Sequence, residues 1–149
     1  MTTRFPLQTV LDLMLVRADD AARELGRLIA DEKDARSRLA LLENYREEYA
    51  TRFRNAASAG LSPLQWANFQ EFASRLEVAI TQQVEIVNAS RDRTTAGQSH
   101  WRDQNQQVQS FDTLAQRHQV AQRYQENRKD QKQTDELATR RHLGKETSD

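Results

Sequence analysis

The segment Ala59-Gly60-Leu61-Ser62-Pro63 decides the fold, because it is the one place in the chain where Gly, Ser and Pro cluster. Gly60 suits the left-handed position that follows a helix end, Ser62 suits a helix N-cap, and Pro63 suits the first position of a helix. On both sides of this turn the sequence is helix-forming for tens of residues. The sequence therefore predicts an all-α fold, a long two-helix antiparallel coiled-coil hairpin.

Apolar residues of the first helix recur in alternating steps of four and three residues. This heptad spacing predicts one buried seam and a left-handed supercoil. Only Glu32 and Arg46 are polar among the seam positions, and the helix is predicted to run from about residue 6 to residue 57. The predicted seam consists of Leu7, Leu11, Met14, Ala18, Ala21, Leu25, Leu28, Glu32, Ala35, Leu39, Leu42, Arg46, Tyr49, Phe53 and Ala56.

The second helix is predicted to follow a turn at about residues 58–62 and to run from residue 63 to about residue 141, with residues 142–149 as a disordered tail. Residues 1–149 are thus predicted to form a single coiled-coil domain. Its seam begins with Trp66, Phe69, Ala73, Leu76, Ile80 and Val87 and returns with Trp101, Val108, Phe111 and Ala115. Between these two stretches the seam weakens, because Gln83, Ser90, Thr94 and Gly97 occupy its positions. A bend or a locally loose stretch is expected at residues 94–97, where β-branched residues and a glycine disfavour helix.

The second helix is predicted to overhang the first. Folding the chain about the turn places Leu7 opposite the region of Phe111 to Ala115, so that residues after about His118 have no partner in the first helix. A polar single helix is marginal in water. The overhang is therefore expected either to fray or to dock on another molecule.

Composition excludes several classes of partner. The 22 basic residues balance the 22 acidic ones, so no basic field attracts nucleic acid or anionic lipid. The chain has no Cys, which excludes disulfides and fits a reducing cytosol. The apolar run Val10–Val16 is broken by Asp12 and is too short to span a bilayer. A cytoplasmic protein without membrane insertion is expected.

Motifs for catalysis or cofactors are lacking. Gly144-Lys145-Glu146-Thr147 is not a phosphate-binding loop, since it has neither the upstream glycine nor the following Ser or Thr. His100, His118 and His142 are too far apart to share one turn of a helix, so no metal site is expected. A two-helix hairpin offers no concave site for acid–base chemistry. The chain is therefore predicted not to be an enzyme and to bind no cofactor.

Two surfaces are candidates for binding. Apolar stripes flank the turn, and Tyr45 and Phe72 within them lie off the seam, where they either remain exposed as a binding surface or thicken the core near the turn. The stripes are Leu42, Tyr45 and Tyr49 on the first helix and Phe72, Leu76 and Ala79 on the second. The overhang is the other candidate. Residues 126–136 mix both charge signs densely, as a contact surface or as a solvated helix face.

Several motifs, including residues off the seam, resemble the FliJ family of flagellar export proteins over nearly the whole chain. They are Asp19-Asp20-Ala21-Ala22-Arg23 with Leu25-Gly26, Trp66-Ala67-Asn68-Phe69-Gln70-Glu71-Phe72, Trp101-Arg102, and Glu126-Asn127-Arg128-Lys129-Asp130-Gln131-Lys132-Gln133-Thr134-Asp135-Glu136. The resemblance implies an antiparallel coiled coil similar to the central stalk of rotary ATPases. It also implies a role in bacterial flagellum biogenesis, type III secretion and protein transport and, through motility, in chemotaxis.

The resemblance further implies a non-catalytic stalk that binds the hexameric flagellar export ATPase, promotes its assembly and activity, and contacts the cytoplasmic domain of the export gate membrane protein. Family members are also linked to the recycling of export chaperones. The implied location is cytoplasmic, peripherally associated with the inner membrane through the export apparatus. A stalk predicts a monomer.

The resemblance assigns residues to both contacts. Gate binding falls on Leu42, Tyr45, Tyr49, Phe72, Leu76 and Ala79. Contact with the ATPase ring falls on the overhang, at Arg128, Lys132, Asp135 and Glu136. Arg38 and Gln83 depart from the Gln and His that the family can have at these positions, which affects the rim of the gate contact.

Two alternatives remain open. The chain is either a stalk or an escort, a general chaperone that recycles export chaperones or carries export substrates. A purely structural coiled-coil dimer with an unrelated partner is the alternative from a different class.

Overall fold

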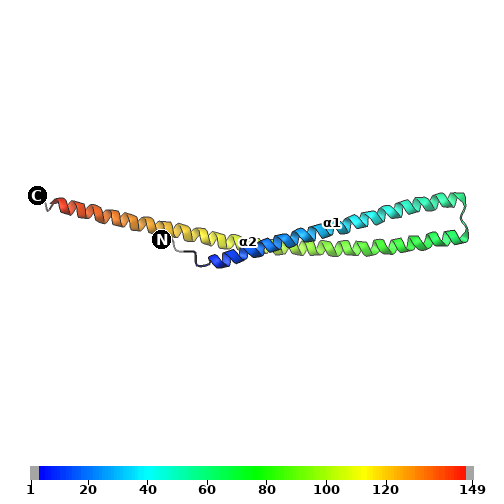
Figure 1. Cartoon of the computed structure of the whole chain (residues 1–149), viewed down its shortest axis with the longest axis horizontal. Coiled ribbons are helices and arrows are strands. Elements are labelled where there is room, and N and C mark those ends of the chain that lie inside the picture. The colour runs from blue at the N-terminus through cyan, green and yellow to red at the C-terminus, as the bar shows by residue number, and fades with distance from the viewer. Residues whose placement is uncertain (1–3, 147–149) are drawn as a thin grey trace. The chain divides into compact units, whose positions relative to one another are not determined.

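The computed structural model describes residues 4–146, which form two α-helices joined by a short turn: α1 (Gln8–Ala59) and α2 (Pro63–Glu146) (Figure 1). Residues 4–146 contain no strand, and the two helices pack antiparallel, so the predicted all-α hairpin is confirmed. The helix α2 continues to Glu146, so residues 142–146, predicted as part of the tail, are helical. The rest of the predicted tail, residues 147–149, lies outside the described residues.

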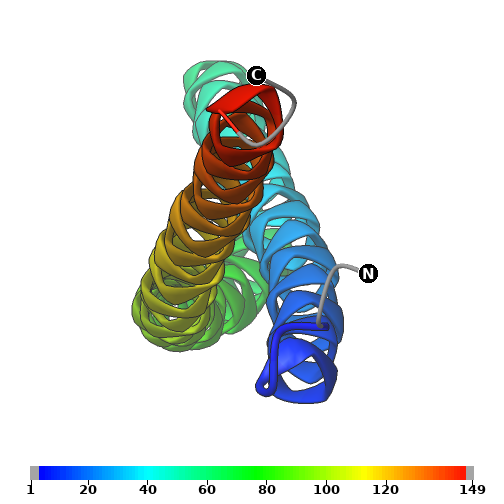
Figure 2. The ribbon, with the colours of Figure 1, turned by 90° about the vertical axis from the view of Figure 1, so that its left-hand side faces the viewer.

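The helices pack in two compact units, each built from a segment of α1 and a segment of α2. The hairpin unit comprises Asp19–Asp103 and contains the turn. The terminal unit comprises Met1–Ala18 together with Gln104–Asp149. Within the hairpin unit Figure 2 shows two helices side by side, and no third element of the described chain covers their seam. Each unit therefore buries one narrow strip and leaves most of its surface to solvent.

The turn has the geometry that its residues predict. Gly60 has a positive φ of 98°, and its amide donates to the Ala57 carbonyl, with 3.2 Å between N and O. The Gln65 amide donates to the Ser62 hydroxyl oxygen at 3.2 Å, and the Ser62 amide donates to the Gln65 side-chain oxygen at 3.0 Å. This reciprocal pair is a capping box, and it starts α2 at Pro63.

The predicted seam is confirmed for most of its positions. Its core consists of the buried residues Leu11, Ala21, Leu28, Ala35, Leu76, Ile80 and Val87. Three predicted members are wrong, because Leu7, Arg46 and Trp66 are exposed. Arg46 reaches across the seam to Glu77, with 3.5 Å between N and O. At the turn the rings of Tyr49, Phe53 and Phe69 lie against one another between the helices, so the seam of α2 begins at Phe69 rather than at Trp66.

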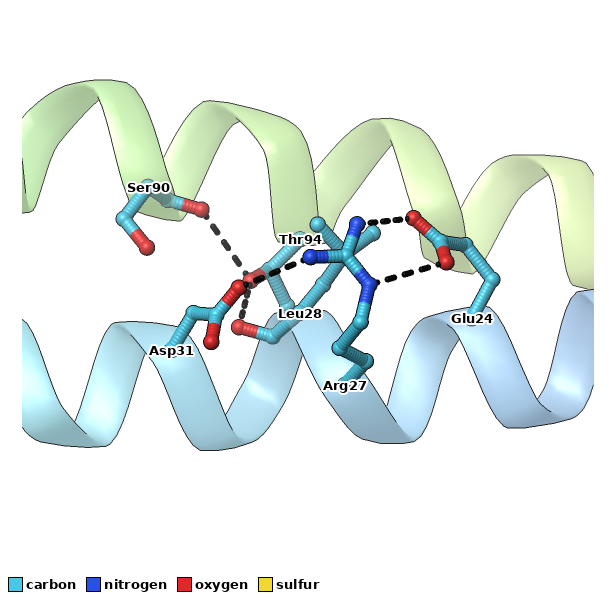
Figure 3. Close-up of polar contacts among 6 residues, drawn as sticks. All are labelled: Glu24, Arg27, Leu28, Asp31, Ser90 and Thr94. Atoms are coloured by element: carbon cyan, nitrogen blue, oxygen red, sulfur yellow. Dashed lines mark hydrogen bonds and ion pairs between the residues drawn. The ribbon is translucent and has the colours of Figure 1, made fainter.

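Polar residues complete the middle of the seam. Gln83, Ser90 and Thr94 are buried, and two of them donate to backbone carbonyls of α1. The Gln83 side-chain nitrogen lies 3.0 Å from the Ala35 oxygen. The Thr94 hydroxyl lies 3.3 Å from the Leu28 oxygen and 3.1 Å from the Ser90 oxygen of its own helix (Figure 3). A hydroxyl has one hydrogen, so these two acceptors share it.

The loose stretch expected at residues 94–97 is wrong, because α2 packs closely on α1 there. The helix α2 runs through this segment without interruption, and Ser90 and Thr94 are among its most buried residues. A Cβ added to Gly97 would lie 2.7 Å from Cδ1 of Leu28 and 3.7 Å from Cδ1 of Leu25. Small side chains on α2 let the backbones approach, and this packing outweighs the low helix propensity of the segment.

Two glycine substitutions test this close approach. Gly26→Ala is expected to stabilise the chain by about 1 kcal/mol, because nothing lies within 4 Å of the added Cβ and alanine favours helix. Gly97→Ala has the same helix preference, but its Cβ displaces Leu28, and overpacking costs about 1–3 kcal/mol. Urea unfolding followed by circular dichroism measures both. Equal stabilisation by the two substitutions would contradict close packing at Gly97.

The terminal unit contains the predicted overhang. The rings of Phe5 and His118 lie 5.5 Å apart, which places His118 beside the residues that precede α1. Every residue from 123 to 146 of α2 is exposed. No other segment of the described chain covers this part of the helix.

Candidate functional site

An aromatic cluster forms the surface of the hairpin unit next to the turn. The ring of Tyr49 on α1 lies 4.3 Å from that of Phe72 and 5.3 Å from that of Phe69, both on α2. Phe53 meets Phe69 edge-on at 5.5 Å. Tilted and edge-on ring pairs at these distances are favourable beyond the apolar area that they bury. The cluster therefore joins the two helices with rigid side chains.

The six residues of the apolar stripes divide by burial. Leu76 is in the core, while Leu42, Tyr49 and Ala79 are half-buried. Tyr45 remains 51% exposed, and Phe72 remains 42% exposed although it packs on Tyr49. Of the two alternatives for Tyr45 and Phe72, the structure therefore favours an exposed aromatic surface over a thicker core. The large apolar area that stays in water is a common feature of binding surfaces.

The two positions that depart from the family pattern lie in different environments. Arg38 is exposed on α1. Gln83 is buried and bonded to the Ala35 carbonyl, so it belongs to the seam between the helices and not to the rim of the stripes. Only Arg38 is therefore available to a partner at the surface.

Ion pairs lie along the outside of the hairpin unit. The Arg27 guanidinium bridges Glu24 and Asp31 along α1 (Figure 3). Its hydrogen bond lowers the pKa of the Glu24 carboxyl below the ordinary value. The hydrogen bond from Arg36 likewise lowers the pKa of Glu32, the acidic residue in the seam. Each of these pairs joins residues one turn apart on the same helix, and the pairs do not converge on a common point. This is the pattern of a solvated helix surface.

The overhang presents the second predicted surface. Arg128, Lys132, Asp135 and Glu136 are all exposed, and none of the four takes part in an ion pair within residues 4–146. Spacings of three, four and seven residues place Arg128, Lys132 and Asp135 on one side of α2. Shallow surface depressions run beside them, and one is lined by Lys132, Asp135, Glu136, Thr139 and Arg140.

A third surface was not assigned from the sequence. The terminal unit exposes large apolar side chains. For Leu13, Leu15 and Val16 the signal was the run Val10–Val16, which the sequence analysis used only to judge whether the chain could span a membrane. The exposed members are Leu7, Leu13, Leu15, Val16, Leu114, Val120, Tyr124, Leu137 and Leu143.

Residues 4–146 contain neither a membrane-spanning stretch nor a cluster of metal ligands. Neither helix there has a stretch both long and apolar enough to cross a membrane. In the same residues, no three side chains among His, Asp and Glu gather in a way that would hold a metal ion.

These features define a coiled-coil protein that presents its binding surfaces on the outside of a two-helix hairpin. A family model described as "Flagellar FliJ protein" matches residues 3–147. The chain is 36% identical over 134 residues to the flagellar FliJ protein of Escherichia coli strain K12, covering 90% of this chain and 91% of that one. It is 34% identical over 134 residues to the flagellar FliJ protein of Salmonella typhi, with the same coverage. The chain belongs to the flagellar FliJ family.

Proposed function

We propose that this chain is a non-catalytic coupling protein of flagellar type III protein export. It binds the hexameric export ATPase, promotes the assembly and activity of the ring, and contacts the cytoplasmic domain of the export gate. It acts as a monomer in the cytoplasm, held at the inner membrane only through the export apparatus. Membership of the flagellar FliJ family supports the flagellar part of this proposal.

The observation that carries the proposal is the exposed helix of the terminal unit. Residues 123–146 continue α2 with every side chain exposed. A polar helix without a packed face is marginal alone in water, so a chain with this design is expected to dock it on a partner. Dense charges of both signs suit a sliding contact inside a ring better than a tight apolar contact. Arg128, Lys132, Asp135 and Glu136 are the residues that we assign to this contact.

The aromatic surface at the turn supports the gate contact. Tyr45 and Phe72 are exposed, while Tyr49 and Leu76 hold the two helices together beneath them. Aromatic side chains that are fixed by packing make strong contacts at low entropic cost. The assigned gate residues are Leu42, Tyr45, Tyr49, Phe72, Leu76 and Ala79.

The test of this function is the turnover rate of the purified cognate export ATPase as the chain is titrated in. Stimulation that saturates near one chain per ATPase hexamer supports the stalk. If a folded, helical chain gives no stimulation, the stalk proposal fails. The escort that recycles export chaperones then becomes the better proposal, with the surface around Tyr45 and Phe72 as its binding site.

The gate contact gives a prediction for Tyr45→Ala. We expect at least tenfold weaker binding to the purified cytoplasmic domain of the gate, since an exposed aromatic hot spot contributes about 2 kcal/mol. Isothermal titration calorimetry measures the affinity. The matched control is Val78→Ala, which truncates another exposed apolar residue of the hairpin unit outside the stripes and is expected to bind normally. Unchanged binding of the Tyr45 variant would remove Tyr45 from the proposed site.

A further inference from the structure

One flank of the hairpin unit carries a row of apolar side chains. A residue three positions after a seam residue points about 60° to one side of the seam, at 100° per residue. The two antiparallel helices are related by a half-turn about a line perpendicular to both, so residues at this spacing lie on the same flank in α1 and α2. On α2 these residues are Phe72, Ala79 and Ile86.

Tyr45 of α1 lies on the same flank. It follows a seam residue by three positions, as Phe72 and Ala79 do on α2. The rings of Tyr49 and Phe72 are 4.3 Å apart across the seam. Because Tyr45 lies one turn before Tyr49 on α1, it is level with the part of α2 between Phe72 and Ala79. The exposed part of the surface that we assign to the gate is therefore this flank of the hairpin.

Ile86 continues the row beyond the assigned gate residues. It is 50% exposed, more than the 42% of Phe72. From Phe72 to Ala79 the row is roughly 10 Å long, and Ile86 extends it to roughly 21 Å at 1.5 Å per residue. The next residues at this spacing are charged, Arg93 on α2 and Asp31 on α1, so the apolar row ends at Ile86.

Arg38 of α1 places one positive charge within the row. The Gln83 side chain donates to the Ala35 carbonyl across the seam, and Arg38 lies three residues beyond Ala35 toward the turn. Arg38 is therefore level with the part of α2 between Ala79 and Ile86. It is exposed and takes part in no ion pair within residues 4–146. A partner that covers the row removes water from this guanidinium, which is costly unless an acidic group pairs with it.

We propose that the export gate binds the whole row, with an apolar pocket for Ile86 and a carboxylate that pairs with Arg38. The inference rests on the proposed function and adds two contacts to the gate surface assigned above. The Asp31 carboxylate on the same flank is already bound by Arg27 (Figure 3), so the partner supplies the carboxylate. A carboxylate can accept two hydrogen bonds from one guanidinium, which makes this pair specific as well as strong.

Continuity of the row argues for a single occupant. Ile86 and Phe72 lie on the same side of one helix, and Tyr45 and Arg38 lie between them in height along the hairpin. A partner seated on Tyr45 and Phe72 therefore reaches Ile86 by continuing along the same flank for roughly 10 Å. The opposite flank differs, since Arg46 and Glu77 form an ion pair across the seam there.

The contact of Ile86 is tested by Ile86→Ala in the full chain. We expect about tenfold weaker binding to the purified cytoplasmic domain of the gate, as for loss of a buried contact residue. Isothermal titration calorimetry measures the affinity, and circular dichroism checks that helicity is unchanged. The matched control is Val84→Ala. Val84 is 39% exposed and follows the seam residue Gln83 by one position, so it lies on the opposite flank and should not affect binding.

The possible contrary results have different consequences. If Ile86→Ala binds normally while Tyr45→Ala binds weakly, the row stops short of Ile86, and the gate contact itself stands. Equal losses for Ile86→Ala and Val84→Ala also overturn the inference, because they show no preference for one flank. If the folded, unsubstituted chain does not bind the gate domain, the proposed gate contact fails together with this inference. If Ile86→Ala changes only self-association in analytical ultracentrifugation, the occupant is a second copy.

The carboxylate is tested by reversing the charge of Arg38. We expect Arg38→Glu to weaken binding to the gate domain at least tenfold, since it sets two like charges against each other. Lys33→Glu changes the net charge equally from a position about 140° around α1, and we expect it to bind normally. Arg38→Gln should lose affinity and most of the salt dependence of binding, because screening acts on the charge pair. Equal effects of Arg38→Glu and Lys33→Glu, or unchanged salt dependence in Arg38→Gln, would overturn the proposed pair.

Discussion

Leu28→Asp is expected to remove most of the stability of the hairpin unit. Leu28 is buried, its side chain lies where a Cβ on Gly97 would collide with it, and its carbonyl accepts the Thr94 hydroxyl. Loss of a buried leucine costs about 2–5 kcal/mol, and a carboxylate in the seam adds the cost of losing water. The total is comparable to the whole stability of a typical small protein, about 5–15 kcal/mol. Thermal and urea unfolding followed by circular dichroism measures the loss.

The neighbouring residue provides the control for this substitution. Ile29 is 48% exposed and lies one position further along α1, about 100° around the helix. Ile29→Asp introduces the same carboxylate with a similar helix propensity, and we expect it to cost about 1 kcal/mol or less. Similar losses for both variants would mean that the seam does not lie where the burial of Leu28 puts it.

Replacing the four assigned charges of the overhang by alanine is expected to abolish most of the stimulation of the export ATPase. The substitutions are Arg128→Ala, Lys132→Ala, Asp135→Ala and Glu136→Ala. If these side chains make the contact with the ring, we expect at least a tenfold loss, as for removal of a binding hot spot. The fold should not change, because all four are exposed and alanine has the highest helix propensity. Turnover against chain concentration, together with helicity by circular dichroism, measures both effects.

A control quadruple variant changes the same numbers of charges elsewhere. Four exposed residues of the hairpin unit, two basic and two acidic, keep the net charge of the control equal to that of the test variant. They are Arg23, Glu43, Glu47 and Arg52. Normal stimulation by the control together with normal stimulation by the overhang variant would remove the overhang from the ATPase contact.

The spacing of apolar residues predicted burial well along part of the seam and poorly at the turn. Where apolar residues repeat regularly, as at Leu28 and Ala35, the spacing predicted which side of α1 is buried. It failed at Trp66, because at the turn the rings of Tyr49, Phe53 and Phe69 fill the space between the helices. Periodicity identifies the side of a helix that faces its partner. It carries no information on which large side chains fit there together.

For the candidate binding surfaces too, the sequence located the residues and the structure decided their exposure. The sequence placed Tyr45 and Phe72 beside the seam but left open whether they join the core, and only the packing of Phe72 on Tyr49 and their remaining exposure decided this. The run Val10–Val16 was visible in the sequence, while the exposure of Leu13, Leu15 and Val16 within it followed from the presence of a single neighbouring helix in the described chain.

By itself, the sequence determined the two helices, the turn at Gly60 and Ser62, and the seam, because these depend on backbone preferences and on spacing within one helix. Only the tertiary structure decided how residues 83–97 behave. Their polar and small side chains predicted weakness, yet Gln83 and Thr94 donate to carbonyls of α1 and Gly97 packs against Leu28. The reason is physical: the distance between two helices depends on the side chains of both at one level, and neither helix alone encodes that distance.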